Sequence, residues 1–287
     1  MKKGIVLSSL TVLLVVSCSI QELDTKESPC SPDPVFYASL EQCSNPDTRV
    51  YLDENVKVSW NADDRITIFN KYTYNQEYIF NGQTGEKAGS FSIVKNNDFV
   101  TGNDYDFICA VYPYQKSTVI SNSGVLSLIL PAEQSYLEGS FGIGANTMVS
   151  TTTDDQLMFK NVGGYLVLKF YGEDISVSSI KLEGNKGEPL SGLATMSTAV
   201  GKSPSITMSS DAGTSVTMVC DKPVTLGDTK EDAKSFWLVV PPTSFTGGFT
   251  LTVTDAKGKV FTKKTTKNLS IVRNGVLRIA AIKVELS

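Results

Sequence analysis

The stretch LMFKNVGGYLVLKFYG at residues 157–172 carries the pattern that decides the fold of this chain. Its apolar residues form short runs separated by Asn and Gly, which is typical of β-strands joined by turns. The pattern continues in IKLEG at 180–184, FWLVVPP at 236–242 and GFTLTVTD at 248–255. Strand-forming Ser, Thr, Val, Ile and Tyr are in surplus over helix formers, and there are 22 Gly and 11 Pro. We therefore expect an all-β protein.

The strand pattern falls into two series. The first begins near Val35, and the segment STTTDD at 150–155 interrupts its rhythm before the second begins. Because strands recur at regular spacing in both series, we predict two β-sandwich domains, at 35–154 and 155–287. In the second domain, DAKG at 255–258 predicts a hairpin turn.

The N-terminal residues 1–17 indicate a lipoprotein signal peptide. They combine two early lysines with an apolar run that is too short to span a bilayer. VVSC, ending at Cys18, has the apolar, small, Cys order of a lipobox, so the mature chain should begin at Cys18 with lipid such as palmitate on its thiol. The alternative is an ordinary secretory signal with an incidental cysteine. Residues 18–34 then form a polar, flexible, lipidated tether, and we expect a lipoprotein of the outer membrane at the cell surface.

The composition argues against catalysis. There is no histidine in the 287 residues, which excludes His-dependent triads and His-based zinc sites. GxSxG, HExxH and phosphate-cradling GxxxxGK[ST] motifs are missing as well. Asp154 and Asp155 are adjacent, so on a strand they would face opposite ways. The net charge of −4 and the lack of a basic patch disfavour nucleic acid. We expect no enzyme, no metal and no cofactor.

Four cysteines follow Cys18. Cys30 and Cys43 flank a Pro-containing segment and would close a disulfide in an oxidising envelope, although two free thiols are an equal alternative because sequence does not fix connectivity. Cys109 and Cys220 lie in apolar runs and are expected to be small core residues.

Seven segments cover nearly all of the mature chain in a characteristic order. They are TRVYLDENVKVSWNADDRITIFN at 48–70, GSF at 89–91, AVYPY at 110–114, LPAEQSY at 130–136, GSFGIGANTMVS at 139–150, LMFKNVGGYLVLKF at 157–170 and VVPPTSFTGGFTLTVTDAKG at 239–258. Together they resemble the fimbrillin family, the lipoprotein precursors of Bacteroidales pilins and of their tip subunits.

This resemblance implies two tandem transthyretin-like antiparallel β-sandwich domains and assembly with other fimbrial subunits into a homo- or hetero-polymer. In such families an Arg-directed protease removes the first strand, and a strand of a neighbouring subunit fills the vacated groove by β-augmentation.

Arg49 is the candidate cleavage site. It is the basic residue nearest the start of the strand after the tether, and Pro46-Asp47 before it predict an exposed turn. Cleavage there would free the chain from its lipid and open the groove. The alternative is a strand-edge arginine that is never cut.

The last segment of the chain is the candidate donor strand. Its apolar residues change parity, so we expect a bulge or a change of sheet near Ala280-Ala281. The alternative is an ordinary last strand that completes its own domain. The candidate donor residues are Val276, Leu277, Ile279, Ile282, Val284 and Leu286.

Two polar clusters complete the candidate sites. Asn61, Asp63 and Asp64 would suit calcium only with help from another loop, and a solvated turn before a strand at Arg65–Phe69 is favoured. The tyrosines of KYTYNQEY at 71–78 would either stack on sugars or, as favoured, pair across strands on one sheet face.

The leading function is therefore a fimbrial subunit at the shaft, the anchor or the tip, assembled by strand exchange. The alternative is a surface lipoprotein adhesin that captures host protein or glycan and never polymerises.

Overall fold

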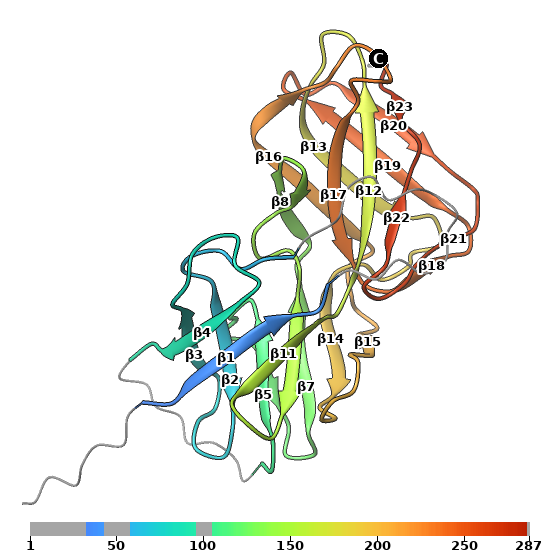
Figure 1. Ribbon diagram of the computed structural model, residues 1–287. Coiled ribbons are helices and arrows are strands. Elements are labelled where there is room, and N and C mark those ends of the chain that lie inside the picture. Colours follow the sequence, from blue (N-terminus) through green and yellow to red (C-terminus); the bar gives the residue numbers. More distant parts are fainter. Residues whose placement is uncertain (1–32, 43–57, 96–104, 286–287) are drawn as a thin grey trace, which may run out of the picture. The chain divides into compact units, whose positions relative to one another are not determined.

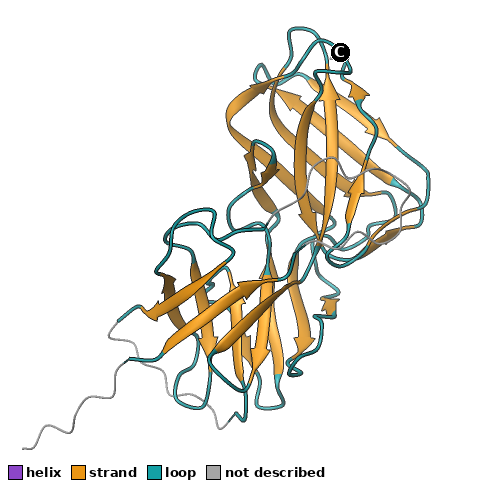
Figure 2. Ribbon diagram, in the orientation of Figure 1, coloured by secondary structure: helices purple, strands orange, loops and turns teal. Residues whose placement is uncertain are grey.

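The computed structural model describes residues 33–42, 58–95 and 105–285 (Figure 1). Every regular element in these ranges is a β-strand, so the all-β class is confirmed (Figure 2). The expected hairpin lies between β19 (Phe249–Asp255) and β20 (Val260–Lys264), with Gly258 at a φ of 79°. Asp255 Oδ1 closes this turn by accepting hydrogen bonds from the backbone N–H groups of Lys257 and Lys259, both at 2.8 Å.

Seven strands form a closed barrel, in which the first and last strands of the sheet also pair with each other. This differs from the sandwich expected for residues 35–154. The physical reason is that β1 pairs on both sides, antiparallel with β4 and parallel with β11, so neither edge stays open. The barrel strands in spatial order are β1 (Val35–Leu40), β11 (Gln156–Asn161), β10 (Met148–Thr152), β5 (Ile108–Tyr112), β2 (Arg65–Phe69), β3 (Gln76–Phe80) and β4 (Ala88–Ile93).

Trp60 lies at the centre of the barrel core and is fully buried. Its ring makes edge contacts at centroid distances of 5.1, 5.5 and 5.3 Å and one tilted contact at 5.9 Å. Such aromatic pairs add stabilisation beyond the apolar area they bury. The four partners are Phe91, Tyr112, Phe159 and Phe80, in the order of those distances.

A four-stranded sheet packs on the outside of the barrel. Strand β5 explains how, because its side chains alternate between the two layers. Ala110 and Tyr112 face the barrel core, whereas Cys109 and Val111 pack in a second cluster with Leu126 and other residues of the outer sheet. The outer strands in order are β15 (Ile206–Met208), β14 (Gly192–Ser197), β7 (Val125–Leu130) and β6 (Val119–Ile120).

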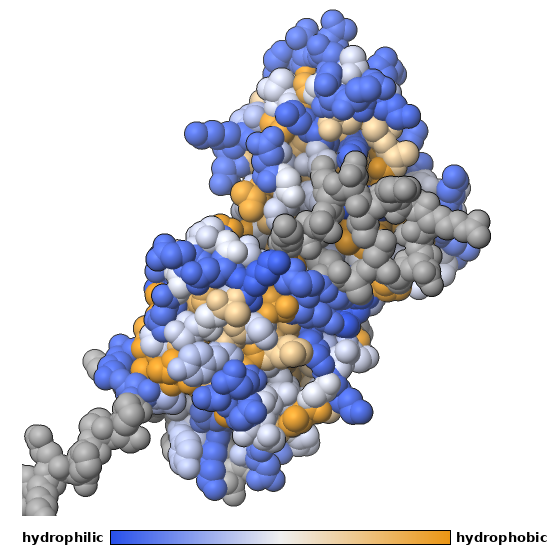
Figure 3. All heavy atoms as spheres, in the orientation of Figure 1, coloured by the Kyte–Doolittle hydropathy of each residue, from blue (hydrophilic) through white to orange (hydrophobic). Residues whose placement is uncertain are grey.

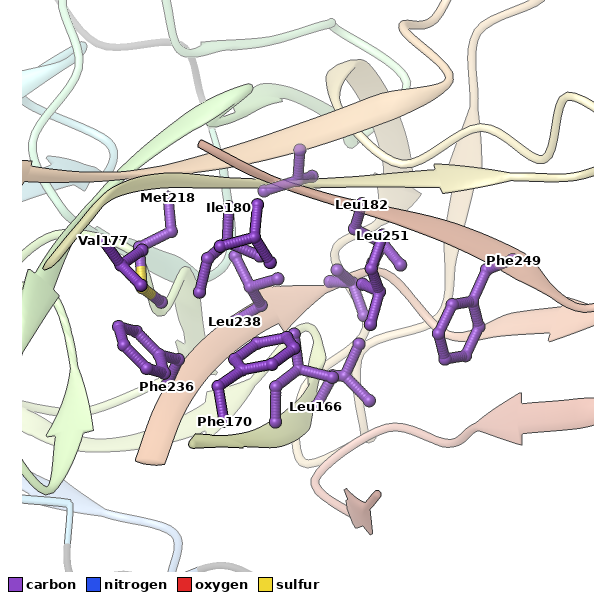
Figure 4. Packing of buried hydrophobic residues seen from close by; sticks show 14 of the residues in the cluster. Leu166, Phe170, Val177, Ile180, Leu182, Met218, Phe236, Leu238, Phe249 and Leu251 are labelled. Atoms are coloured by element: carbon purple, nitrogen blue, oxygen red, sulfur yellow. The ribbon is translucent and has the colours of Figure 1, made fainter. Parts of the chain in front are cut away.

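The remaining strands form two further sheets and a short strand pair. Buried residues from the two sheets pack together in the largest hydrophobic core of the described residues (Figure 4). One sheet contains β20, β19, β13 (Ser176–Gly184), β16 (Ser215–Thr225), β8 (Glu133–Leu137) and β9 (Ser140–Phe141). The other contains β17 (Lys234–Val240), β12 (Gly164–Tyr171), β22 (Val276–Arg278) and β23 (Ile282–Lys283), and the pair β18 (Thr243–Phe245) and β21 (Leu269–Ile271) completes the fold.

Strands from the two sides of the predicted boundary at 154/155 share sheets. Strand β8 precedes that boundary and pairs with β16, whereas β14 follows it and pairs with β7. The side chain of Gln134 fixes β8 further, because its amide exchanges two hydrogen bonds with the backbone of Val239, at 2.6 and 3.0 Å. The domain boundary itself stays a prediction.

Candidate functional site

Strand β1 lies between β4 and β11 and joins them, and we call it the seam of the barrel. Its backbone pairs with β4 from Val35 to Ser39 and with β11 from Tyr37 to Leu40. The ladder with β11 extends at both ends, where Tyr37 N–H donates to Asp155 O at 2.9 Å and Glu41 N–H donates to Phe159 O at 2.8 Å. Six consecutive residues therefore hold together two strands that would otherwise be edges.

Alternate side chains of β1 fill the barrel. Phe36 and Ala38 are buried, and the Phe36 ring meets the ring of Tyr78 edge to face at 5.2 Å. Burial raises the pKa of Tyr78 to about 12, so this phenol stays neutral at physiological pH. The groove that β1 occupies therefore accepts an aromatic and then a small side chain.

The outward face of the seam is partly apolar. Tyr37 is 52% exposed and Met158 on the neighbouring strand is 60% exposed. With Ser39, Ala88 and Gly89 they line a shallow groove along β1 and β11. Figure 3 shows that apolar residues on the visible face of the described part form separate patches bordered by hydrophilic ones.

The C-terminal segment lies in its own chain, parallel to β12. The pairs Tyr165 with Val276 and Phe170 with Ile282 bracket a register shift, because the C-terminal segment has one residue more than β12 between them. The bulge expected near Ala280-Ala281 is thus confirmed, and the partner strand does not change.

Because of this bulge, odd-numbered apolar residues before it and even-numbered ones after it face the same core. Leu277, Ile279 and Ile282 pack against the main core, and Val284 is buried in it. The Arg278 guanidinium lies over the ring of Trp237 on β17, 5.1 Å from its centroid. Whether this segment is donated to another subunit stays a prediction, and Leu286 lies outside the described residues.

The segment after β1 and the turn before β22 are joined by an ion pair that the sequence did not indicate. Arg273 donates from Nη1 to Glu41 Oε2 at 2.6 Å and from Nη2 to Glu41 Oε1 at 2.9 Å. Nη1 also donates to Asn161 O at 3.0 Å, and the backbone N–H of Asn161 donates to Glu41 Oε2 at 3.1 Å. Hydrogen bonding to this carboxylate raises the pKa of Arg273.

Asn274 extends the same contact. It is buried and adopts a φ of 58°, a conformation that asparagine tolerates better than most residues. Its Nδ2 donates to Gln42 O at 2.9 Å, and its Oδ1 accepts from Asn161 Nδ2 at 2.6 Å. Asn146 Nδ2 donates in turn to Asn161 Oδ1 at 2.7 Å. A buried amide network therefore surrounds the ion pair.

Several predicted residues lie outside the described ranges. They are the lipidation residue Cys18, the cleavage candidate Arg49 and the disulfide candidates Cys30 and Cys43. Cys109 and Cys220 are confirmed as buried core residues with free thiols. Burial raises the pKa of the Cys109 thiol to about 12 and that of Cys220 to about 11, which makes both poor nucleophiles.

The acidic cluster forms the favoured turn before β2. Asp63 has a φ of 66°, and Asp64 Oδ2 accepts from Asn61 N–H at 2.7 Å. Tyr112 Oη donates to Asp64 Oδ1 at 3.0 Å, but burial dominates and raises the pKa of Asp64. In residues 33–42, 58–95 and 105–285, no group of three or more Cys, Asp or Glu side chains could hold a metal ion.

The three tyrosines of 71–78 do not share a sheet face, so that expectation is wrong. Strand β3 begins only at Gln76, and the residues before it belong to a turn region. Tyr78 is buried in the barrel, Tyr74 donates from Oη to Ile120 O at 3.3 Å, and Tyr72 is 78% exposed. Alternation along the sequence gave no sign of where the strand starts.

The described ranges contain no helix with the length and apolarity that a membrane span requires. Searches with protein-family models and among curated proteins found no match. Among solved structures, in contrast, matches were found.

A candidate cell adhesion protein from Bacteroides ovatus is similar over 88% of this chain and 94% of its own, with a TM-score of 0.50 and 13% identity. The chain has the fold of this Bacteroides protein. Another, from Bacteroides uniformis, gives a TM-score of 0.47 at 17% identity, covering 91% of this chain and 97% of its own. The tip fimbrial protein Mfa3 from Porphyromonas gingivalis, with a C-terminal truncation, gives 0.31 at 10% identity, covering 88% and 98%.

The fold shared with the Bacteroides ovatus protein is consistent with the resemblance to the fimbrillin family. At these identities the likeness establishes the fold and leaves the function to be argued from the site.

Proposed function

We propose that this protein is a structural subunit of a surface fimbria. It is exported as an outer-membrane lipoprotein held through Cys18, and it joins other fimbrial subunits by β-strand exchange. The subunit carries a mechanical role and no catalysis. Structural neighbours described as adhesion and fimbrial proteins support the cell-surface part of this proposal.

The observation that carries the proposal is the position of β1. This strand pairs with both β4 and β11 in the closed barrel, and it precedes Arg49 in the sequence. A cut after Arg49 would separate β1, together with the lipid on Cys18, from the rest of the chain. Loss of β1 would then leave β4 and β11 as unpaired edges and would uncover the sites of Phe36 and Ala38.

Such a groove suits an incoming strand better than a small molecule. Main-chain groups of β4 and β11 supply hydrogen bonds on both sides, and alternate side-chain sites set the register. The proposed donor is the C-terminal segment of a neighbouring subunit, from Val276 onward. Under the same proposal, the chain consists of two tandem transthyretin-like domains, and β1 closes the first of them into a barrel.

A second function rests on the outer face of the seam. Tyr37 and Met158 expose apolar area beside a shallow groove, a surface on which a sugar ring or a host protein could settle. Under this alternative the protein is a surface adhesin that does not polymerise.

An Arg49→Lys variant tests the leading proposal, because it keeps the charge but removes the site of an Arg-directed protease. We expect filaments of the wild type, labelled by an antibody in electron microscopy, to contain chains that begin at Val50. The variant should stay membrane-bound and begin at Cys18, while the matched variant Arg65→Lys assembles normally. Filaments built from chains that begin at Cys18 would contradict the proposal, and membrane-only labelling of the wild type would support the adhesin.

A further inference from the structure

The ion pair between Glu41 and Arg273 joins two segments that are 232 residues apart in sequence. Glu41 directly follows β1, and Arg273 lies in the turn that leads into β22. With the neighbouring bond from Asn274 Nδ2 to Gln42 O, the two residues form a contact that we call the latch. It therefore connects the strand that closes the barrel with the segment that ends the chain.

The geometry gives the latch more strength than an ordinary surface ion pair. Both guanidinium Nη atoms bind the one carboxylate, in the bidentate form that charge-assisted hydrogen bonds favour. The side chains of Arg273 and Glu41 are only 22% and 24% exposed, so water screens them less than an exposed pair. Loss of Glu41 would leave a partly buried guanidinium without its carboxylate, which costs more than the loss of an exposed bond.

The C-terminal segment depends on few other main-chain contacts. Within residues 33–42, 58–95 and 105–285, strands β22 and β23 pair on one side, with β12. Between and after them, Ile279 N–H donates to Val167 O and Val284 N–H donates to Tyr171 O, both at 2.9 Å. A segment that lies at the edge of a sheet and contains a bulge opens more easily than a central strand. The latch lies at the start of this segment, so its loss should make the segment easier to open.

We propose that the latch couples the two strands, so that departure of β1 loosens the C-terminal segment and departure of that segment loosens β1. The biological meaning of this coupling rests on the proposed strand exchange. There, the latch keeps the donor segment docked on its own β12 until β1 has been removed. A subunit that has not been cut therefore does not offer its C-terminal strand.

Amide hydrogen exchange on the full, uncut chain tests the coupling. In Glu41→Gln we expect exchange at Ile279 and Val284 to accelerate about tenfold, the effect of losing a charge-assisted bond, with no change in β13. In Arg273→Gln the amides of Tyr37 and Glu41 should accelerate in the same way. The exchanged pair Glu41→Arg with Arg273→Glu should restore part of the protection at both ends.

The matched control is Glu77→Gln, because Glu77 accepts from Arg65 Nη1 at the same 2.6 Å but joins β2 and β3. It should leave exchange at Ile279 and Val284 unchanged. If Glu41→Gln leaves those amides unchanged, or accelerates β13 equally, the pair is merely structural and the coupling is refuted.

A second variant measures the coupling directly. Phe36→Ala weakens the hold of β1 in the barrel and should accelerate exchange at Ile279 in the wild-type background. In the Glu41→Gln background the same change should add no further acceleration, and equal acceleration in both would refute the coupling.

These measurements need no filament, so they separate the two proposals. Coupled exchange in a chain that never polymerises would keep the latch and reject the fimbrial function. Filaments formed by a chain in which β1 and the C-terminal segment exchange independently would support the fimbrial function and reject the latch.

Discussion

Strand β1 and the segment β22–β23 occupy equivalent positions beside neighbouring strands, yet they are held differently. Strand β1 runs parallel to β11, and β22 and β23 run parallel to β12, the next strand along the chain. However, β1 also pairs with β4 and closes a barrel, whereas β22 ends its sheet in the part of the chain that the structure describes. Removing β1 thus creates two new edges, and moving β22–β23 creates one. Loss of β1 should therefore cost more stability than release of β22–β23, which makes β22–β23 the better candidate for donation to another subunit.

The largest expected effect is on the β1 side. Phe36→Ala removes a buried ring from the barrel and should lower the free energy of unfolding by about 3–5 kcal/mol in urea titrations. Tyr37→Ala on the same strand should change it by less than about 0.5 kcal/mol, because that side chain is 52% exposed. Equal losses in the two variants would mean that β1 does not depend on its inward face.

A smaller effect is expected on the C-terminal side. Val284→Ala removes two buried methyl groups and should cost about 1–2 kcal/mol. Because β23 lies at the edge of its sheet in the described part of the chain, we expect hydrogen exchange to rise most at Val284 and Ile279. It should rise less at Tyr37, which is coupled to this segment through the latch. Equal acceleration at all three amides would contradict this expectation and would show that the edge segment opens only together with the barrel.

The smallest effect concerns pH and the barrel interior. Burial raises the pKa of Asp64 above its ordinary value of 3.8, so just above that value the folded state binds more protons than the unfolded chain. This contribution to stability is therefore present at low pH and is lost as pH rises through the raised pKa. The unfolding free energy of the wild type relative to Asp64→Asn should fall as pH rises above about 4. The neighbouring Asp63→Asn serves as the control, and a wild-type difference that rises with pH would contradict this sign.

Local features of the fold followed from sequence. The DAKG hairpin, the strand at Arg65–Phe69, the bulge near Ala280-Ala281 and the buried Cys109 and Cys220 were all predicted and are confirmed. Each depends on the alternation or turn chemistry of a few consecutive residues. The tyrosines of 71–78 show the limit, since the same alternation did not reveal the turn that ends before β3.

The candidate site was only half predictable. Alternating residues identified the C-terminal segment, but nothing near Arg273 or Glu41 in the sequence indicates that they form an ion pair. Their contact exists because β1 and β22 are placed by parallel pairing with β11 and β12, which meet at the short turn after Asn161. Contacts of such sequence separation depend on the register of several strands at once.

The sequence by itself determined that this chain consists of short strands, where many of its turns lie, and which faces are apolar, because these properties depend on neighbouring residues. Only the tertiary structure decided that β1 closes a barrel, that β8 and β14 join sheets across the expected boundary, and that Glu41 meets Arg273. The physical reason is that strands with similar alternation compete for the same partners. The choice among them is made by the packing of whole sheets.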